Sequence, residues 1–489
     1  MTRSYNIMKD ANHIPSKRIK LDSNKGDISR SNVNEYTGWK VPSSNFEIET
    51  ITQENDEKIN AKQFFDSYVS QRKPVVLRSY VQDDLSKLIE WKKSNELLKK
   101  LAGTEQVMVE QRSATNDSFG RGNEVSLIFS EFLDLIEKGD SLHYLTTQDV
   151  ECNADGQPDL MAPFMKSLSE HFPVRPKLMG NLIPQNINIW MGNSKNDGSS
   201  SGLHHDYHDN LYIVLRGKKK FRLYSPHDTE KMYTRGKLLK VHPNGRINYE
   251  GDETTAYGTD LKSDDAAKAS RAKEYAEKLL IEAEKALLEG KPGAEKELEK
   301  AEEMLEEAMD ALIDAEREDH HSDEEECDLF TPQERNPDEY LIDEDGFDCV
   351  DGNDSQDKCI EKKTDDQSKM AVRRLVDKTV KNPDNFSKIS PHLLANTSQL
   401  LKEYPAILKA TAAFCELEAG DILYLPASWF HEVTSFGEDK HLMEGNETVL
   451  GHLATNYWFH PPDNLHDFEN PYSTDFWPND YKVRLGKKN

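Results

Sequence analysis

A long charged segment, residues 254–369, interrupts two stretches of similar texture and strongly constrains how this chain of 489 residues can fold. On both sides of it, short apolar runs are punctuated by glycine and proline, which is typical of antiparallel strands in a sandwich or barrel. We therefore predict one mainly β domain in two parts, residues 46–253 and 370–489, that close on each other around the insertion.

The insertion itself has two predicted halves. Residues 264–317 are rich in alanine, glutamate, lysine and leucine at helical spacing, and Gly290–Gly293 breaks the pattern, so we predict a hairpin of two antiparallel helices. Residues 318–369 are acidic and poor in apolar side chains, which predicts disorder. The helical hairpin could dock a partner or join two copies of the chain, but its composition favours a solvated insertion.

The first 45 residues are polar and lack sustained periodicity, so we expect residues 1–45 to form a disordered tail. Within it, Lys17, Arg18 and Lys20 follow a proline and resemble a short nuclear import signal. This favours a nuclear over a cytoplasmic location, although basic runs of this length also occur by chance.

Charge and cysteine content exclude several classes of protein. The net charge of −27 is concentrated near the insertion, which argues against direct contact with nucleic-acid phosphates and is compatible with a basic protein partner. The number of cysteines is odd, 5, and none forms a Cys-x-x-Cys pair, so we expect neither a disulfide framework nor a zinc ribbon. No apolar run approaches the ~20 residues that span a bilayer, so we expect a soluble intracellular protein without membrane contact.

Two apolar strands of the second part, residues 413–417 and 422–425, flank the sequence Glu-Ala-Gly-Asp at 418–421. This arrangement predicts a β-hairpin with a tight turn.

Candidate metal ligands lie on either side of the insertion. His204 and Asp206 stand two residues apart, so on a strand they share a face and can bind one metal ion while His205 points away. His431, shortly after the strand at 422–425, can supply a second imidazole. Two histidines and one carboxylate on one face of an octahedron suit non-haem iron(II), with positions left open for cosubstrate and oxygen. A His-x-Asp tripeptide alone is common, and an isolated one lies more often in a surface loop.

The residues around these ligands resemble a known family. Segments 201–212, 216–226 and 420–433 are similar, in order and spacing, to the motifs of the JmjC hydroxylases, the cupin-like branch of the 2-oxoglutarate oxygenases. The likeness covers residues 46–253 and 380–480. It implies a double-stranded β-helix (a jelly roll) with flanking helices, iron(II) as the metal, and 2-oxoglutarate and O2 as cosubstrates.

The resemblance assigns roles to individual residues. His204, Asp206 and His431 match the family's iron ligands. The sequence departs from the family in the long gap between Asp206 and His431, which the insertion largely accounts for. Because the entropy of closing a loop grows slowly with its length, we expect the site to survive the insertion, which could cover or regulate its mouth.

Lys219 matches the lysine that binds the distal carboxylate of 2-oxoglutarate. Strand alternation also predicts that Lys219 points inward while Lys218 and Lys220 face water, and a buried ammonium needs an anionic partner. The alternative is that all three lysines solvate a strand edge. Further cosubstrate contacts implied by the resemblance are Asn210, Tyr144, Ser201 and Asn456. We expect Trp429 and Trp458 to pack in the core instead.

Several functions are compatible with this pattern. The first is hydroxylation of a protein side chain, coupled to decarboxylation of 2-oxoglutarate to succinate. A lysine or arginine demethylase would use the same chemistry, but no zinc-binding reader domain accompanies the catalytic segments here. A non-catalytic cupin-like scaffold is a third possibility, and hydroxylation of RNA or a small molecule a fourth. The substrate, the modified residue and the oligomeric state cannot be read from the sequence.

Overall fold

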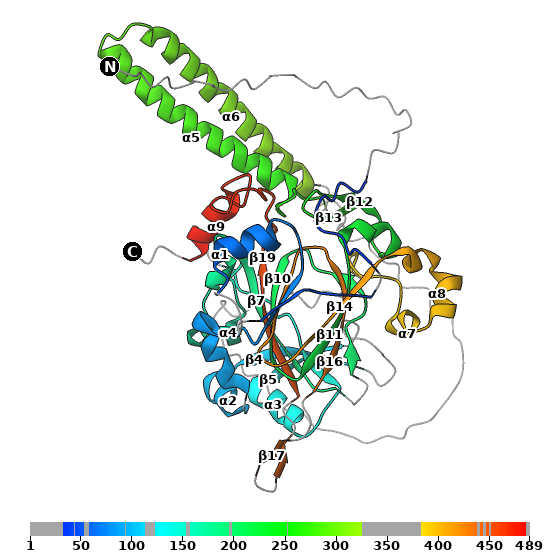
Figure 1. Ribbon diagram of the computed structural model, residues 1–489. Coiled ribbons are helices and arrows are strands. Elements are labelled where there is room, and N and C mark those ends of the chain that lie inside the picture. The colour runs from blue at the N-terminus through cyan, green and yellow to red at the C-terminus, as the bar shows by residue number, and fades with distance from the viewer. Residues whose placement is uncertain are drawn as a thin grey trace, which may run out of the picture. The chain divides into compact units, whose positions relative to one another are not determined.

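The computed structural model describes residues 33–43, 45–52, 58–92, 94–112, 123–152, 157–194, 198–251, 253–324, 383–437, 441–443, 446–448 and 451–485. The fold is mainly β, with two large sheets and flanking helices, which agrees with the predicted jelly-roll core (Figure 1). Residues 1–32, with the basic run, and 325–382 lie outside the described residues. The import signal and the disorder of those two segments therefore stay predictions.

The larger sheet has nine strands in the order β2-β3-β15-β10-β19-β7-β6-β4-β5. Their bounds are β2 Thr50–Thr52, β3 Val75–Arg78, β4 Gln106–Gln111, β5 Asn123–Ile128, β6 His143–Leu145, β7 Pro184–Gly192, β10 Asp209–Arg216, β15 Ile422–Leu425 and β19 His452–Phe459. Strands from before and after the insertion alternate in its centre, because β10 lies between β15 and β19.

The smaller sheet has six strands, ordered β1-β14-β11-β16-β8, with β9 also paired to β16. Their bounds are β1 Phe46–Glu47, β8 Ser199–Ser200, β9 His204–His205, β11 Lys218–Tyr224, β14 Ala412–Leu417 and β16 Phe430–Phe436. Two separate strand pairs complete the β structure: β12 Leu238–Val241 with β13 Ile247–Tyr249, and β17 His441–Met443 with β18 Asn446–Thr448.

The core sits on both faces of the larger sheet. Along β10, Leu211, Ile213 and Leu215 belong to one buried cluster, whereas Tyr212 and Val214 belong to another that also contains side chains of the smaller sheet. Since successive side chains of a strand point to opposite faces, the second cluster is the layer where the two sheets pack together.

Helices cover the outer face of the larger sheet. Four apolar side chains of α3 are buried there, at helical spacing. The α-helices outside the insertion are α1 Ala61–Phe64, α2 Glu96–Ala102, α3 Phe129–Glu137, α4 Pro163–Lys166, α7 Pro391–Leu394, α8 Thr397–Glu403 and α9 Phe476–Arg484. A π-helical turn, Phe65–Val69, follows α1, and 3-10 turns span Asp83–Lys92, Ser169–His171, Lys177–Met179, Pro226–Lys231 and Pro405–Lys409.

The insertion contains two long helices, α5 (Leu261–Leu288) and α6 (Ala294–Glu324), joined at Gly290–Gly293 (Figure 1). Both glycines have positive φ, which suits the predicted tight turn. Buried alanines recur every seven residues on each helix, at Ala269, Ala276 and Ala283 and at Ala294, Ala301 and Ala308. Their small side chains let the two helices pack closely. Among the described helices, none is long and apolar enough to cross a membrane.

Three boundaries or connections differ from the sequence-based predictions. Ordered structure begins before residue 46, because Tyr36 and Val41 are buried in the core. Helix α6 continues past residue 317 to Glu324, although most residues of this last stretch are weak helix formers. The segments at 413–417 and 422–425 do not form a hairpin: β14 pairs with β11, β15 pairs with β10, and the turn between them links the two sheets. Alternation shows which face of a strand is buried but not which strand is its neighbour.

A buried ion pair ties the turn after α1 to the larger sheet. The Arg72 and Asp209 side chains are fully buried, with Arg72 Nη1 2.7 Å from Asp209 Oδ2. Asp209 also accepts hydrogen bonds from Tyr424 Oη at 2.7 Å and from the Ala427 backbone at 2.9 Å. Asp209 is the first residue of β10, shortly after the metal-ligand motif, and it connects this strand to the turn at Arg72, to β15 and to the loop that follows β15.

Replacing Asp209 with alanine should lower the free energy of unfolding by about 3–5 kcal/mol, because Arg72 would keep a buried charge without its partner. Urea unfolding followed by tryptophan fluorescence measures the change. The matched control is Asp66→Ala, which removes the exposed ion pair between Asp66 and Lys62 and should cost less than about 1 kcal/mol. Equal losses in the two variants would contradict the prediction.

Candidate active site

The three predicted metal ligands meet where β9 pairs with β16. His204 and His431 are direct cross-strand partners, and Asp206 follows β9. One ligand atom from each residue lies within 4.8 Å of the others, and His431 Nε2 is 3.7 Å from Asp206 Oδ2. Across the described residues, no other group of three such side chains comes this close together. His205 points the other way, as predicted, and its Nε2 lies 2.8 Å from Tyr249 Oη.

Backbone carbonyls orient both imidazoles in the same manner. His204 Nδ1 lies 2.9 Å from the Gly202 oxygen, and His431 Nδ1 lies 2.9 Å from the Trp429 oxygen. An Nδ1–H that donates to a carbonyl leaves the Nε2 lone pair free for a metal. Burial, with His431 nearby, lowers the pKa of His204 to about 4, so this imidazole is neutral at pH 7, the form that binds metal.

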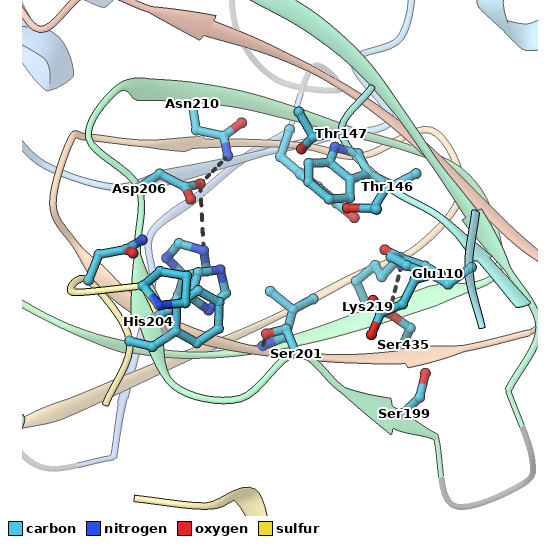
Figure 2. A pocket seen from close by; sticks show the side chains of 18 of the residues that line it. Glu110, Thr146, Thr147, Ser199, Ser201, His204, Asp206, Asn210, Lys219 and Ser435 are labelled. Carbon is cyan, nitrogen blue, oxygen red and sulfur yellow. Dashed lines mark hydrogen bonds and ion pairs between the residues drawn. The ribbon is translucent and has the colours of Figure 1, made fainter. Parts of the chain in front are cut away.

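Asp206 supplies the negative charge of the cluster. Burial by itself raises the pKa of its carboxyl group, but the neighbouring His431 and His204 outweigh burial and lower it. Two side chains donate to Asp206 Oδ2 (Figure 2 shows the first): Asn210 Nδ2 at 3.4 Å and Trp458 Nε1 at 3.3 Å. Both bonds are long, so they orient the carboxylate without using its capacity to bind a cation.

The donor set fits a redox-active divalent metal. Two imidazoles and one carboxylate match the ligands of non-haem iron(II) sites. A structural zinc site would have four protein ligands, and here only three side chains converge among the described residues. Three protein ligands leave coordination positions for small molecules.

A cavity of about 900 Å³ contains the cluster (Figure 2). The predicted site residues on its wall are His204, Asp206, His431, Lys219, Asn210, Tyr144 and Ser201. They come from both sheets and from both sides of the insertion, so the cavity exists only when the two parts of the domain are closed on each other.

Lys219 reaches this cavity from the middle of the smaller sheet. It is fully buried, whereas Lys218 and Lys220 are exposed, which is the alternation that the sequence predicts. Its Nζ donates to Ser435 Oγ at 2.7 Å and lies 3.2 Å from His452 Nδ1. An ammonium group has three donors, so one remains for a ligand in the cavity.

Lys219 forms no ion pair with any carboxylate of the described residues, although Glu110 lines the same cavity. Burial alone lowers the pKa of Lys219 to about 7. His452 does not add charge, because burial, followed by the neighbouring Lys219, holds its pKa well below the usual value. A buried lysine of this kind gains a full charge when an anion binds beside it.

Tyr144 and Ser201 also lie on the cavity wall. The Tyr144 ring packs against Trp190 and His452, with centroid distances of 6.4 and 5.8 Å. Ser201 Oγ accepts a hydrogen bond from the Val433 backbone at 3.1 Å and donates to the Gly202 oxygen at 3.0 Å. Its hydroxyl hydrogen is therefore engaged in the ligand-free protein.

The two asparagines occupy different layers. Asn210 lines the cavity, whereas Asn456 is fully buried behind it. Asn456 accepts from Trp190 Nε1 at 2.8 Å and donates to Asn210 Oδ1 at 3.0 Å, and Asn210 in turn donates to Asp206. Asn456 thus reaches the metal cluster through Asn210 and is one residue removed from the cavity.

The two tryptophans that we expected in the core behave differently. Trp429 is 1% exposed and stacks on Trp39, with ring centroids 5.8 Å apart, so its core role is confirmed. Trp458 lines the cavity and donates to Asp206, so the core prediction is wrong for this residue. An indole ring is largely apolar, so the sequence predicts that it packs in the core. The hydrogen-bond partner of its N–H group cannot be predicted from the sequence.

Three functional positions were missed. Ser435 follows His431 and Val433 on one face of β16, and this alternation could have identified it. His452 carries no such signal, because its contact with Lys219 crosses from one sheet to the other. Phe386, just after the insertion, stacks on His204 at 4.7 Å and also lines the cavity.

Comparison with known proteins places this fold and site in a family. A family model for the cupin-like domain matches residues 61–465. JmjC domain-containing protein 4 of Schizosaccharomyces pombe is 34% identical over 464 residues, which is 90% of each chain.

More distant relatives match shorter segments. Lysine-specific demethylase 8 of Xenopus tropicalis is 26% identical over 40% of each chain. The human bifunctional peptidase and (3S)-lysyl hydroxylase is 28% identical over 16% of this chain and 24% of its own. The extent of the family match and the nearly full-length likeness to the fission yeast protein leave one assignment: the chain belongs to the JmjC-domain family of cupin-like proteins.

Proposed function

We propose that this protein is an iron(II)- and 2-oxoglutarate-dependent dioxygenase that hydroxylates a protein side chain. JmjC proteins are generally 2-oxoglutarate-dependent oxygenases. The observation that carries the proposal is that one cavity contains both the cluster His204, Asp206 and His431 and the buried Lys219. The ammonium group of Lys219 forms no ion pair with the described residues.

Each part of the cavity has a role in this proposal. His204, Asp206 and His431 hold iron(II), which when bound activates O2 together with 2-oxoglutarate. Lys219 and Ser435 bind the distal carboxylate of the cosubstrate through charge-assisted hydrogen bonds. The remaining predicted contacts, Tyr144, Ser201, Asn210 and Asn456, bind or orient the cosubstrate directly or through one another.

The volume of the cavity is sufficient for a substrate side chain in addition to the cosubstrate. Pockets for small organic ligands measure roughly 300–1,000 Å³. At about 900 Å³, this cavity can hold a molecule as small as 2-oxoglutarate and still admit an amino-acid side chain beside the metal. The human relative is named as a (3S)-lysyl hydroxylase, which is compatible with a protein substrate here.

The test is succinate formation from 2-oxoglutarate by the full-length protein with iron(II), ascorbate and oxygen, read by mass spectrometry. In the same samples, 2-oxoglutarate binding is measured on the anaerobic iron(II) form. We expect binding and slow turnover without substrate, and a mass gain of one oxygen on a protein substrate. Absence of both binding and turnover would remove the enzyme assignment and favour the scaffold function.

A demethylase is the second candidate, because the Xenopus tropicalis relative is named as one. It would release formaldehyde from a methylated peptide, whereas a hydroxylase leaves the added oxygen on the product. Methylated and unmethylated copies of a responding peptide, assayed for both products, separate the two reactions.

Cosubstrate affinity should depend on pH through Lys219, whose pKa is about 7 before the anion binds. The bound carboxylate raises that pKa, so binding takes up a proton above pH 7. We therefore expect constant affinity below pH 7 and a loss of up to about ten-fold per pH unit above it. Calorimetry of the manganese(II) form measures both the affinity and the proton uptake.

The control for this pH dependence is Lys219→Arg, because a guanidinium stays charged throughout the range. Any titration of the metal ligands is common to both proteins. The ratio of the two dissociation constants therefore isolates the effect of the lysine. A ratio that does not change between about pH 6 and about pH 8.5, a range that spans the pKa of about 7, would contradict the prediction.

A further inference from the structure

The first described residues after the insertion form an additional strand beside the metal ligands. The backbone N–H of Ser387 donates to the Leu203 oxygen at 2.8 Å, and the N–H of His205 donates to the Asn385 oxygen at 3.2 Å. These two bonds frame an antiparallel bridge between Phe386 and His204. In Figure 2, the yellow ribbon of this segment runs beside His204.

The geometry of that bridge directs the Phe386 ring onto a metal ligand. Phe386 and His204 are the non-hydrogen-bonded pair of the bridge, so their side chains are close and share a face. The two rings are stacked, with centroids 4.7 Å apart and planes inclined by 10°. On its other side, His204 pairs with His431, whose ring centroid is 4.3 Å away.

Further hydrogen bonds fix the segment in place. Asn385 Nδ2 donates to the His205 backbone oxygen at 2.5 Å, and Ser387 Oγ donates to the Met232 oxygen at 2.7 Å. The N–H of Arg235 donates to the Phe386 oxygen at 2.8 Å. Residues on both flanks of Phe386 are therefore anchored, so its ring rests on a fixed backbone.

We propose that Phe386 is a positioning residue for the metal centre: it holds the His204 imidazole by stacking and so sets the direction of the Nε2 lone pair. This inference rests on the proposed function, since it assumes that His204 is a metal ligand. A single hydrogen bond from Nδ1 to the Gly202 oxygen holds the His204 ring, and the remaining motion of the ring is a small rotation about its Cβ–Cγ bond. A flat ring against one face of the imidazole opposes this rotation, and an aliphatic side chain of similar volume does so less well.

Residues that follow the insertion in the chain also line the cavity. Pro383, Asn385 and Phe386 are among the first described residues after it, and they belong to the second part of the β domain. This segment supplies part of the wall around the metal cluster, and the Phe386 side chain contacts the metal-ligand residue His204 directly.

The experiment compares Phe386→Leu with Phe386→Tyr in the full-length protein. Cobalt(II) is titrated into metal-stripped, oxygen-free protein, and its visible absorption reports the affinity and the ligand geometry. We expect leucine to weaken cobalt(II) binding by about ten-fold and to alter the absorption bands, because partners that orient a ligand typically contribute 10–100-fold to metal affinity. Tyrosine keeps the flat ring and should restore both properties.

The matched control is Phe46→Leu, the same substitution at a ring that packs on Trp39 away from the cavity. Thermal midpoints with EDTA then separate loss of folding from loss of positioning. The inference is overturned if leucine binds cobalt(II) like wild type, if tyrosine fails as leucine does, or if Phe46→Leu shows the same loss.

Failure of the proposed function gives a different pattern. Wild type that binds cobalt(II) and responds to Phe386→Leu, but neither binds nor turns over 2-oxoglutarate, would reject the dioxygenase while supporting the positioning role. Wild type that binds no cobalt(II) would overturn both.

Discussion

Replacement of Asp206 by alanine is expected to abolish turnover of 2-oxoglutarate, with a residual rate below about one thousandth of wild type. The substitution removes the one carboxylate of the cluster and leaves the two imidazoles to hold a divalent cation. A metal ion contributes several kcal/mol to its reaction, and each 1.36 kcal/mol corresponds to about a ten-fold change in rate. Succinate formation and metal content after dialysis are the two measurements.

The same substitution should leave the metal-free fold almost unchanged. Asp206 accepts only two long side-chain hydrogen bonds, at 3.3 and 3.4 Å, so their loss costs little. Asp228→Ala is the matched control, because Asp228 is also buried but holds the Thr411 backbone and Lys231 outside the cavity. It should lower the thermal midpoint and keep the turnover of the folded fraction. Substantial turnover by Asp206→Ala would remove the metal assignment.

Replacement of Lys219 by methionine should weaken 2-oxoglutarate binding on the order of 100-fold, since the distal carboxylate would lose the ammonium group that the proposal places beside it. Methionine keeps the length of the side chain and removes the ammonium. Lys218→Met is the control, because that neighbouring lysine is exposed and pairs with Glu416. Binding of 2-oxoglutarate to the anaerobic metal form gives the affinities, and equal affinities in the two variants would contradict the assignment.

Lys219→Met should also raise the thermal midpoint of the ligand-free protein at pH 7. Burial lowers the pKa of Lys219 in the folded protein to about 7, below its ordinary value of 10.5, so folding costs free energy at every pH below 10.5. This cost grows as pH falls from 10.5 to 7 and is constant below 7. As pH rises from 7 to 10.5, wild type should therefore gain stability relative to the methionine variant. Differential scanning fluorimetry at several pH values measures the difference between their thermal midpoints.

The sequence predicts those parts of the site whose residues lie within a few positions of one another in the chain. The spacing of His204 and Asp206 places them on one side of the chain, and the alternation of three lysines identifies Lys219 as the buried one. Both rest on the two-residue period of a strand, which is visible in any single segment.

The contacts that the sequence did not predict join segments far apart in the chain. Phe386 lies on His204, Trp458 donates to Asp206, and His452 contacts Lys219, each from the other side of the insertion. Periodicity specifies the face of a strand but not its neighbour, and the wrongly predicted hairpin at residues 413–425 fails for the same reason. Those pairings depend on the closure of both sheets.

The strand order has a consequence for how the chain is made on the ribosome. Strand β10 takes both its neighbours, β15 and β19, from beyond the insertion, and β11 likewise takes β14 and β16. At about 5–20 residues per second, tens of seconds pass between the synthesis of β11 and of its first partner. During that interval β10, which is mostly apolar, and β11, which has one apolar face, lack the neighbours on both edges, and unpaired strand edges readily associate with other chains. The helices α5 and α6, which are synthesised in between, are highly charged, and we expect their charge to oppose such association until the second part of the domain has been made.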